Sequence, residues 1–146
     1  MIISHYLTTE HRHCDDLFAQ AESAAAQNNW EAAEQAFLAF SNDTLLHFKK
    51  EEEELFPVYE AKTGSHDGPT QVMRFEHDQV RGLISKMADA VERNDRDAYL
   101  SLSESMMILL QQHNMKEEQM LYAMCDRVFP PELKEDTVTA MKEIQL

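Results

Sequence analysis

The sequence predicts an all-α protein: an antiparallel up-down-up-down four-helix bundle with a short C-terminal helix. Only three glycines and four prolines occur in 146 residues, whereas an all-β chain needs a turn about every 8–12 residues. Ala, Leu, Met, Glu, Gln and Lys dominate between these breaks, and all of them favour helix. Apolar residues recur at intervals of three and four, and short polar turns join the segments, which indicates antiparallel helices.

The N-terminal half of the chain is expected to form one hairpin. A first helix covers residues 3–27, and the tight polar turn Asn28-Asn29 separates it from a second helix over residues 30–56. Proline has no backbone N–H and clashes with the preceding helical turn. We therefore expect Pro57 to bend or end this helix, leaving only a short continuation.

The C-terminal half is expected to repeat this design. After a loop over residues 63–68, a proline that suits the first turn of a helix opens a third helix over residues 69–93. The turn Asn94-Asp95 leads to a fourth helix over residues 97–129. The weakly amphipathic segment after the next two prolines, within residues 130–146, predicts a short fifth helix.

The length predicts one domain with one core, not two. This domain covers residues 1–146. It comprises two αα-hairpin repeats, over about residues 3–62 and 69–129, and the C-terminal segment 130–146.

The charge of the chain bears on its partners. The formal net charge of −14 argues against nucleic acid or an anionic membrane surface as the main partner. The longest apolar run, residues 106–110, is too short to span a bilayer. The N-terminus lacks the basic start and apolar stretch of a secretion signal, so we expect a cytoplasmic protein. Cys14 and Cys125 form no disulfide framework.

An internal repeat organises the seven histidines. At an offset of 66 residues, four equivalences appear: Glu10-His11 with Glu76-His77, Asn28 with Asn94, His47 with His113, and Glu51-Glu52 with Glu117-Glu118. Each half therefore contains Glu-His, an interval of 36 residues, and then His-x-x-x-Glu-Glu-x-x-Leu-aromatic. Because residues equidistant from a hairpin turn lie at the same height, one histidine from each helix reaches a single level of the bundle.

Two glutamates complete this level. Glu51 and Glu117 each follow a histidine by four residues, so imidazole and carboxylate project from the same helix face. Burying these groups without partners costs several kcal/mol per group, and metal ions remove that cost. The predicted ligands are His11, His47, Glu51, His77, His113 and Glu117. Mixed imidazole and carboxylate ligands with open positions favour non-haem iron over manganese or zinc.

The same residues carry a resemblance to a known family. The motifs are Glu10-His11, the run His47-Phe48-Lys49-Lys50-Glu51-Glu52-Glu53-Glu54-Leu55-Phe56-Pro57, Glu76-His77, and the run His113-Asn114-Met115-Lys116-Glu117-Glu118-Gln119-Met120-Leu121-Tyr122. They resemble those of hemerythrin-like (HHE cation-binding) domains over about residues 3–129. The resemblance implies two oxo- or hydroxo-bridged iron ions, with the four histidines as terminal ligands and both glutamates as bridges.

Two departures from oxygen-carrying hemerythrins stand out. Those proteins have a His-x-x-x-His pair on the third helix, whereas here Met73 lies four residues before His77 and Arg81 four residues after it. They also place an aspartate five residues after the last histidine, whereas Glu117 and Glu118 are both available here, and the symmetry of the repeat favours Glu117. The missing histidine leaves one iron more open, which argues against stable oxygen carriage.

The expected partner is a small diatomic ligand (O2 or NO) or peroxide, with the protein as sensor, scavenger or redox protein. The alternatives are iron storage or donation, for example to damaged iron–sulfur clusters, and a structural metal-binding module for a protein partner that the sequence leaves open. Glu54, Glu118 and His66 stay open as additional ligands. The simplest interpretation places six polar residues at the surface: Glu52, Glu53, Glu54, Glu118, His5 and His13. Phe56 and Tyr122, at equivalent positions of the repeat, are expected to pack in the core.

Overall fold

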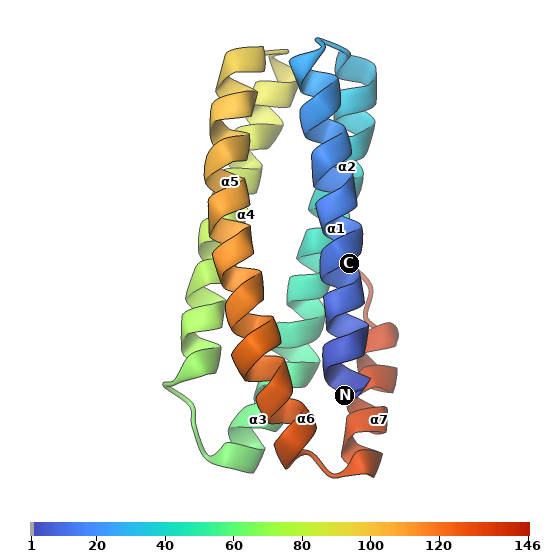
Figure 1. Ribbon diagram of the computed structural model, residues 1–146, viewed down its shortest axis with the longest axis vertical. Coiled ribbons are helices and arrows are strands. Elements are labelled where there is room, and N and C mark those ends of the chain that lie inside the picture. The colour runs from blue at the N-terminus through green and yellow to red at the C-terminus, as the bar shows by residue number, and fades with distance from the viewer. Residues whose placement is uncertain (1) are drawn as a thin grey trace.

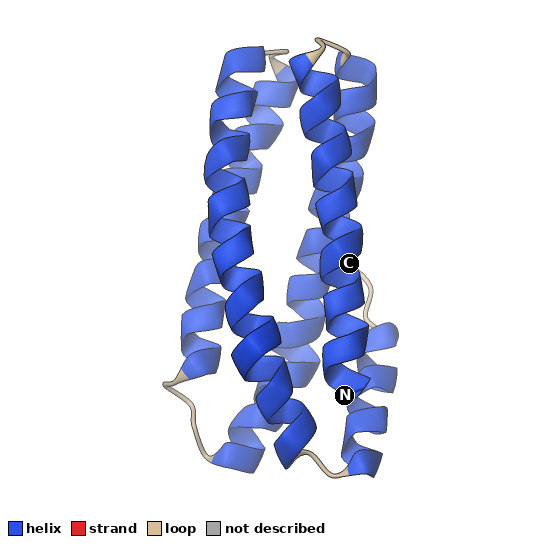
Figure 2. Cartoon of the chain, in the orientation of Figure 1, coloured by secondary structure: helices blue, strands red, loops and turns tan. Residues whose placement is uncertain are grey.

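The computed structural model describes residues 2–146 and confirms the all-α prediction. Within that range the chain contains no strand, and two long helical hairpins stand side by side (Figures 1 and 2). The elements are α1 (Ile2–Ala26), α2 (Trp30–Lys50), the π-helical turn η1 (Glu51–Leu55), α3 (Phe56–Thr63), α4 (Pro69–Glu92), α5 (Arg96–Lys116), the π-helical turn η2 (Glu117–Leu121), α6 (Tyr122–Val128) and α7 (Pro131–Lys142). The last of these is the predicted fifth helix.

The two tight turns have the same construction. Asn28 and Asn94 end α1 and α4 with φ angles of 57° and 52°, a left-handed conformation that asparagine tolerates better than most residues. The side chains of Asn29 and Asp95 then accept hydrogen bonds of 3.3 Å and 3.1 Å from the backbone N–H three residues further on. These bonds cap the N-termini of α2 and α5. The repeat seen in the sequence is thus a structural repeat.

The predicted short continuation beyond Pro57 is present, but Pro57 does not end the helical stretch. The helical stretch continues through Pro57 to Thr63, where Gly64 terminates it with a φ of 72°. Pro57 is the second residue of α3, directly after the change from π-helical to α-helical bonding. The second repeat has Ala123 at the equivalent position and forms the same π-helical turn, so the proline does not cause it.

Two apolar clusters fill the bundle and leave a polar level between them. One lies toward the two tight turns, and the other lies toward the opposite end, where α7 packs beside α1 and η1 (Figure 1). The largest fully buried members of the first cluster are Phe40, Phe48, Met87, Tyr99 and Met106, and those of the second are Ile3, Leu7, Leu55, Phe56, Tyr122, Phe129 and Met141. The predicted ligands occupy the level between the clusters.

No helix within residues 2–146 has the length and hydropathy needed to cross a bilayer.

Candidate metal centre

The structure brings all six predicted ligand side chains together at one level of the bundle. They come from α1, α2, η1, α4, α5 and η2, and are His11, His47, Glu51, His77, His113 and Glu117 respectively. None of the six exposes more than 3% of its surface. Such burial is unusual for so many ionisable groups and requires that they satisfy one another or an ion.

The donor atoms form two groups that share one carboxylate. His11, His47 and Glu117 make the first group, in which every donor lies within 4.8 Å of the others. The Nε2 atom of His11 lies 3.1 Å from Oε1 of Glu117, and the Nε2 atom of His47 lies 4.0 Å from the same oxygen. This group can hold one ion.

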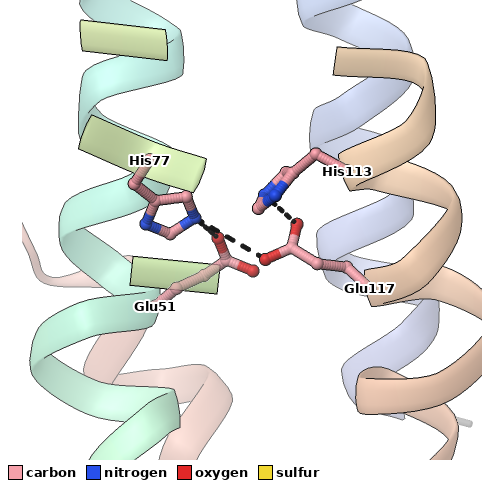
Figure 3. Close-up of side chains that lie close together, drawn as sticks. All are labelled: Glu51, His77, His113 and Glu117. Carbon is pink, nitrogen blue, oxygen red and sulfur yellow. Dashed lines mark ion pairs between the residues drawn. The ribbon is translucent and has the colours of Figure 1, made fainter. Parts of the chain in front are cut away.

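The second group lies across the bundle and contains four side chains. Figure 3 shows the carboxylates of Glu51 and Glu117 pointing toward each other, with His77 and His113 beside them. Nε2 of His77 lies 3.2 Å from Glu51 and 3.7 Å from Glu117, and Nε2 of His113 lies 3.2 Å from Glu117. Glu51 also lies 3.3 Å from Nε2 of His47. Both carboxylates therefore face imidazoles from both hairpins.

Each of the four histidines presents its other ring nitrogen to a further carboxylate. The Nδ1–carboxylate distances are 2.7 Å for His11–Glu118, 2.9 Å for His47–Glu10, 2.7 Å for His77–Glu52 and 2.8 Å for His113–Glu76. An ionised carboxylate only accepts hydrogen bonds, so Nδ1 donates in each pair. In the neutral ring, Nε2 then carries no proton, and its lone pair points toward the centre of the cluster. This arrangement is common among metal-binding histidines.

A basic side chain holds each of these outer carboxylates in turn. The pairs are Lys50 with Glu10, Arg81 with Glu52, Lys116 with Glu76, and Arg12 with Glu118. Burial opposes the ionisation of Glu10 and Glu52, but the partner histidine and cation outweigh it and lower the pKa of each carboxyl to about 2. The outer carboxylates thus stay charged at neutral pH and fix the histidine tautomers.

The expectation that Glu52 and Glu118 belong to a solvated face is wrong. Both are half-buried, and each reaches a histidine of the other hairpin. Glu10 and Glu76 bond instead to the second histidine of their own hairpin. The signal was present in the sequence, because all four glutamates keep the repeat offset of 66 residues.

The π-helical turns add a residue to the site that the sequence reading missed. In η2 the N–H of Tyr122 bonds to the carbonyl of Glu117, five residues earlier, and Phe56 bonds to Glu51 in the same way in η1. A side chain five positions after the glutamate therefore lies on the same face, where an α-helix would place position four. The expectation that Tyr122 only packs is therefore wrong, because its hydroxyl donates a hydrogen bond of 2.9 Å to Glu117.

Several donor atoms at the centre lack hydrogen-bond partners. Among the described residues, nothing bonds Oε1 of Glu51, Nε2 of His77, Nε2 of His113 or Oε2 of Glu117, although all four atoms are buried. They approach one another at ion-pair distances but without hydrogen-bond geometry. This is the arrangement expected when the lone pairs of several donor atoms point at one shared position between them. These residues fit a metal cation.

The charges of the cluster also favour a bound cation. Burial disfavours the charged form of His77, yet the carboxylates of Glu117 and Glu51 outweigh it and raise its pKa to about 10. Burial also opposes the ionisation of Glu117, but His113, His11 and His47 hold its pKa well below its usual range. The cluster thus stabilises positive charge at its centre, which protons supply in the metal-free chain and a cation replaces.

The other proposed ligands lie outside both groups. His66 is exposed in the loop before α4, Glu54 is half-buried, and Glu118 faces Nδ1 of His11 and the guanidinium of Arg12. The surface placement of His5 and His13 is confirmed.

Met73, which lies one turn before His77, lines an apolar pocket of about 260 Å³. The pocket is bounded by residues of α3, α4, α5, η2 and α6: Tyr59, Pro69, Val72, Met73, Lys116, Met120, Leu121 and Met124. Met73 itself is 3% exposed. The position four residues before His77 thus carries an apolar side chain and offers no imidazole.

Comparison with known proteins agrees with this geometry. A family model for the hemerythrin HHE cation binding domain matches residues 2–125, a range that contains all six ligand candidates. Comparisons with curated proteins and with solved structures found no match.

Proposed function

The chain belongs to the hemerythrin HHE cation binding family, and we propose on this basis that it is a non-haem di-iron protein that binds or reacts with O2, NO or peroxide. The family and the buried cluster together make it a metal-binding domain. The number of ions, their identity and the small ligand are the proposal.

The two donor groups that share Glu117 are the observation that carries this function. Four imidazoles and two bridging carboxylates offer eight donor atoms, whereas two ions with five or six positions need roughly ten to twelve. The remainder is available to solvent, a bridging oxygen or a small ligand. Zinc prefers four ligands in structural sites, so the open positions favour iron.

The side chains around the centre prepare it for such a ligand. The outer carboxylates hold each imidazole with Nε2 inward. The ring of Phe48 stacks on His77 at 3.8 Å between centroids, and the ring of Phe56 lies 5.7 Å from it. This imidazole is therefore held by aromatic packing and is fully buried. When bound, iron supplies redox chemistry and an open coordination position.

Iron donation is the weaker candidate. An ion released to a partner must leave a cluster whose six ligands are almost completely buried and whose histidines are each held by an outer carboxylate. Such a site is expected to release a bound ion slowly, which disfavours donation to a partner.

Metal analysis combined with optical spectra tests the proposal. We expect two irons per chain after iron-replete expression, and charge-transfer bands that change when the reduced protein meets air, NO or peroxide. Bound zinc, or a metal-free chain under these conditions, would contradict it. Rapid loss of iron to a chelator without any ligand-linked spectral change would favour iron donation.

A further inference from the structure

The hydroxyl of Tyr122 lies at the centre of the first donor group. Its oxygen is 3.2 Å from Nε2 of His11 and 3.3 Å from Nε2 of His47. It is also 2.6 Å from Oε2 of Glu51 and 2.9 Å from Oε1 of Glu117. The side chain is completely buried. One phenol oxygen thus touches donor atoms of four candidate ligands.

These contacts exceed what a phenol can satisfy by hydrogen bonding. A hydroxyl carries one proton, so it donates to Glu51 or to Glu117 at any moment but not fully to both. With Nδ1 of His11 and His47 facing carboxylates, the neutral rings also direct lone pairs at this oxygen. With neutral imidazoles, the phenol oxygen and its four neighbouring donor atoms share a single proton. A bound cation would balance the lone pairs that converge there.

The distances match those between neighbouring ligands of one ion. Ligands at about 2.1 Å from a metal and at right angles to each other lie about 3 Å apart. The four distances from the Tyr122 oxygen, 2.6 to 3.3 Å, bracket this value. We propose that Tyr122 is a protein ligand, through its phenolate oxygen, of the ion held by His11 and His47. This inference rests on the proposed metal-binding function.

Coordination exchanges one bond for another. The O–H bond of Tyr122 breaks, the oxygen keeps the electron pair and bonds to the cation, and the proton leaves to water. Metal binding at this oxygen therefore releases one proton from the chain.

The phenolate makes the two ions unequal. The repeat places Phe56 at the position equivalent to Tyr122, and it has no oxygen to offer. Among the described residues, the second group contains only Glu51, His77, His113 and Glu117. The ion at His77 and His113 thus keeps more open positions, on the side of the bundle where Met73 lines the apolar pocket. Small ligands are expected to bind there.

Spectroscopy of the iron-loaded chain tests the inference. Loaded with ferric iron, the protein should show a phenolate-to-iron charge-transfer band in the visible. Resonance Raman excitation in this band should enhance tyrosine ring modes, which shift when the tyrosines are ring-deuterated. Tyr122→Phe should abolish the band while iron stays bound. Tyr99→Phe is the matched control, because Tyr99 is equally buried and its hydroxyl bonds to none of the described residues.

The outcomes separate this inference from the proposed function. Iron bound without a phenolate band, or a band that survives Tyr122→Phe, overturns the Tyr122 ligand and leaves the di-iron proposal intact. A chain that binds no iron overturns both. The labelled wild-type protein gives the answer even if the Tyr122 variant fails to fold.

Discussion

Glu52 and His77 join the two hairpins at the metal level: the carboxylate of Glu52 accepts a hydrogen bond of 2.7 Å from Nδ1 of His77. Arg81 holds the second oxygen of the same carboxylate at 2.8 Å. His11 and Glu118 repeat this arrangement on the other side. The hairpins are thus connected through the outer carboxylates as well as through the proposed bridging ligands.

Removing the charge of Glu52 should weaken metal binding without displacing a proposed ligand. Glu52→Gln keeps the size of the side chain but no longer holds the His77 tautomer by charge, and losses of outer partners typically cost about 10–100-fold in metal affinity. Competition with a chelator should show this loss for one of the two ions. Glu53→Gln is the control, because Glu53 is the exposed neighbour. Equal affinities in the two variants would refute the positioning role of Glu52.

The ligand assignment predicts metal content. His47→Ala removes a donor of the first group, and Glu117→Ala removes the carboxylate that both groups share. Each variant should bind one ion or fewer, measured by metal analysis after the same loading. His13→Ala is the matched control, since His13 is exposed and pairs with Asp43 at 2.8 Å. If both site variants kept two ions, the assignment would be wrong.

The bundle and the common level of the six side chains could be predicted from the sequence, because both features depend on regular residue spacing. The apolar period defines helices, and the offset of 66 residues aligns His11 with His77 and His47 with His113. These relations survive small errors in the helix ends. For example, α1 ends at Ala26 and not at residue 27.

The π-helical turns were not predictable in the same way. A reading at 3.6 residues per turn places Tyr122 about 140° around the helix from Glu117, whereas i→i+5 bonding returns it to the same face. No residue type marks such a turn, since Pro57 and Ala123 occupy equivalent positions in the two repeats. The place of Tyr122 in the site follows from backbone geometry.

Asp126 should stabilise the bundle without affecting metal content. Its carboxylate accepts hydrogen bonds of 2.9 Å and 3.1 Å from the N–H groups of Ile3 and Ser4 in the first turn of α1, and loss of such a cap costs about 1–2 kcal/mol. Asp126→Ala should lower the free energy of unfolding by this amount in urea titrations and keep full metal occupancy. The exposed Asp136→Ala should change neither quantity. Loss of metal in Asp126→Ala would show that α1 positions His11 through this cap.

Removing the metal should make stability fall with rising pH. In the metal-free chain the pKa of His77 is about 10, against 6.5 for the ordinary group, because carboxylates outweigh the cost of burial. The raised value means that the folded state binds the proton more tightly, so the stabilisation is complete below pH 6.5 and is lost as pH rises toward 10. Bound metal replaces this proton, so the loaded protein should not lose stability in that window. Urea unfolding at pH 6, 8 and 10 measures how the free energy of unfolding changes with pH, in the metal-free and in the metal-loaded protein. A metal-free chain equally stable at pH 6 and pH 10 would show that the cluster does not hold protons in place of the metal.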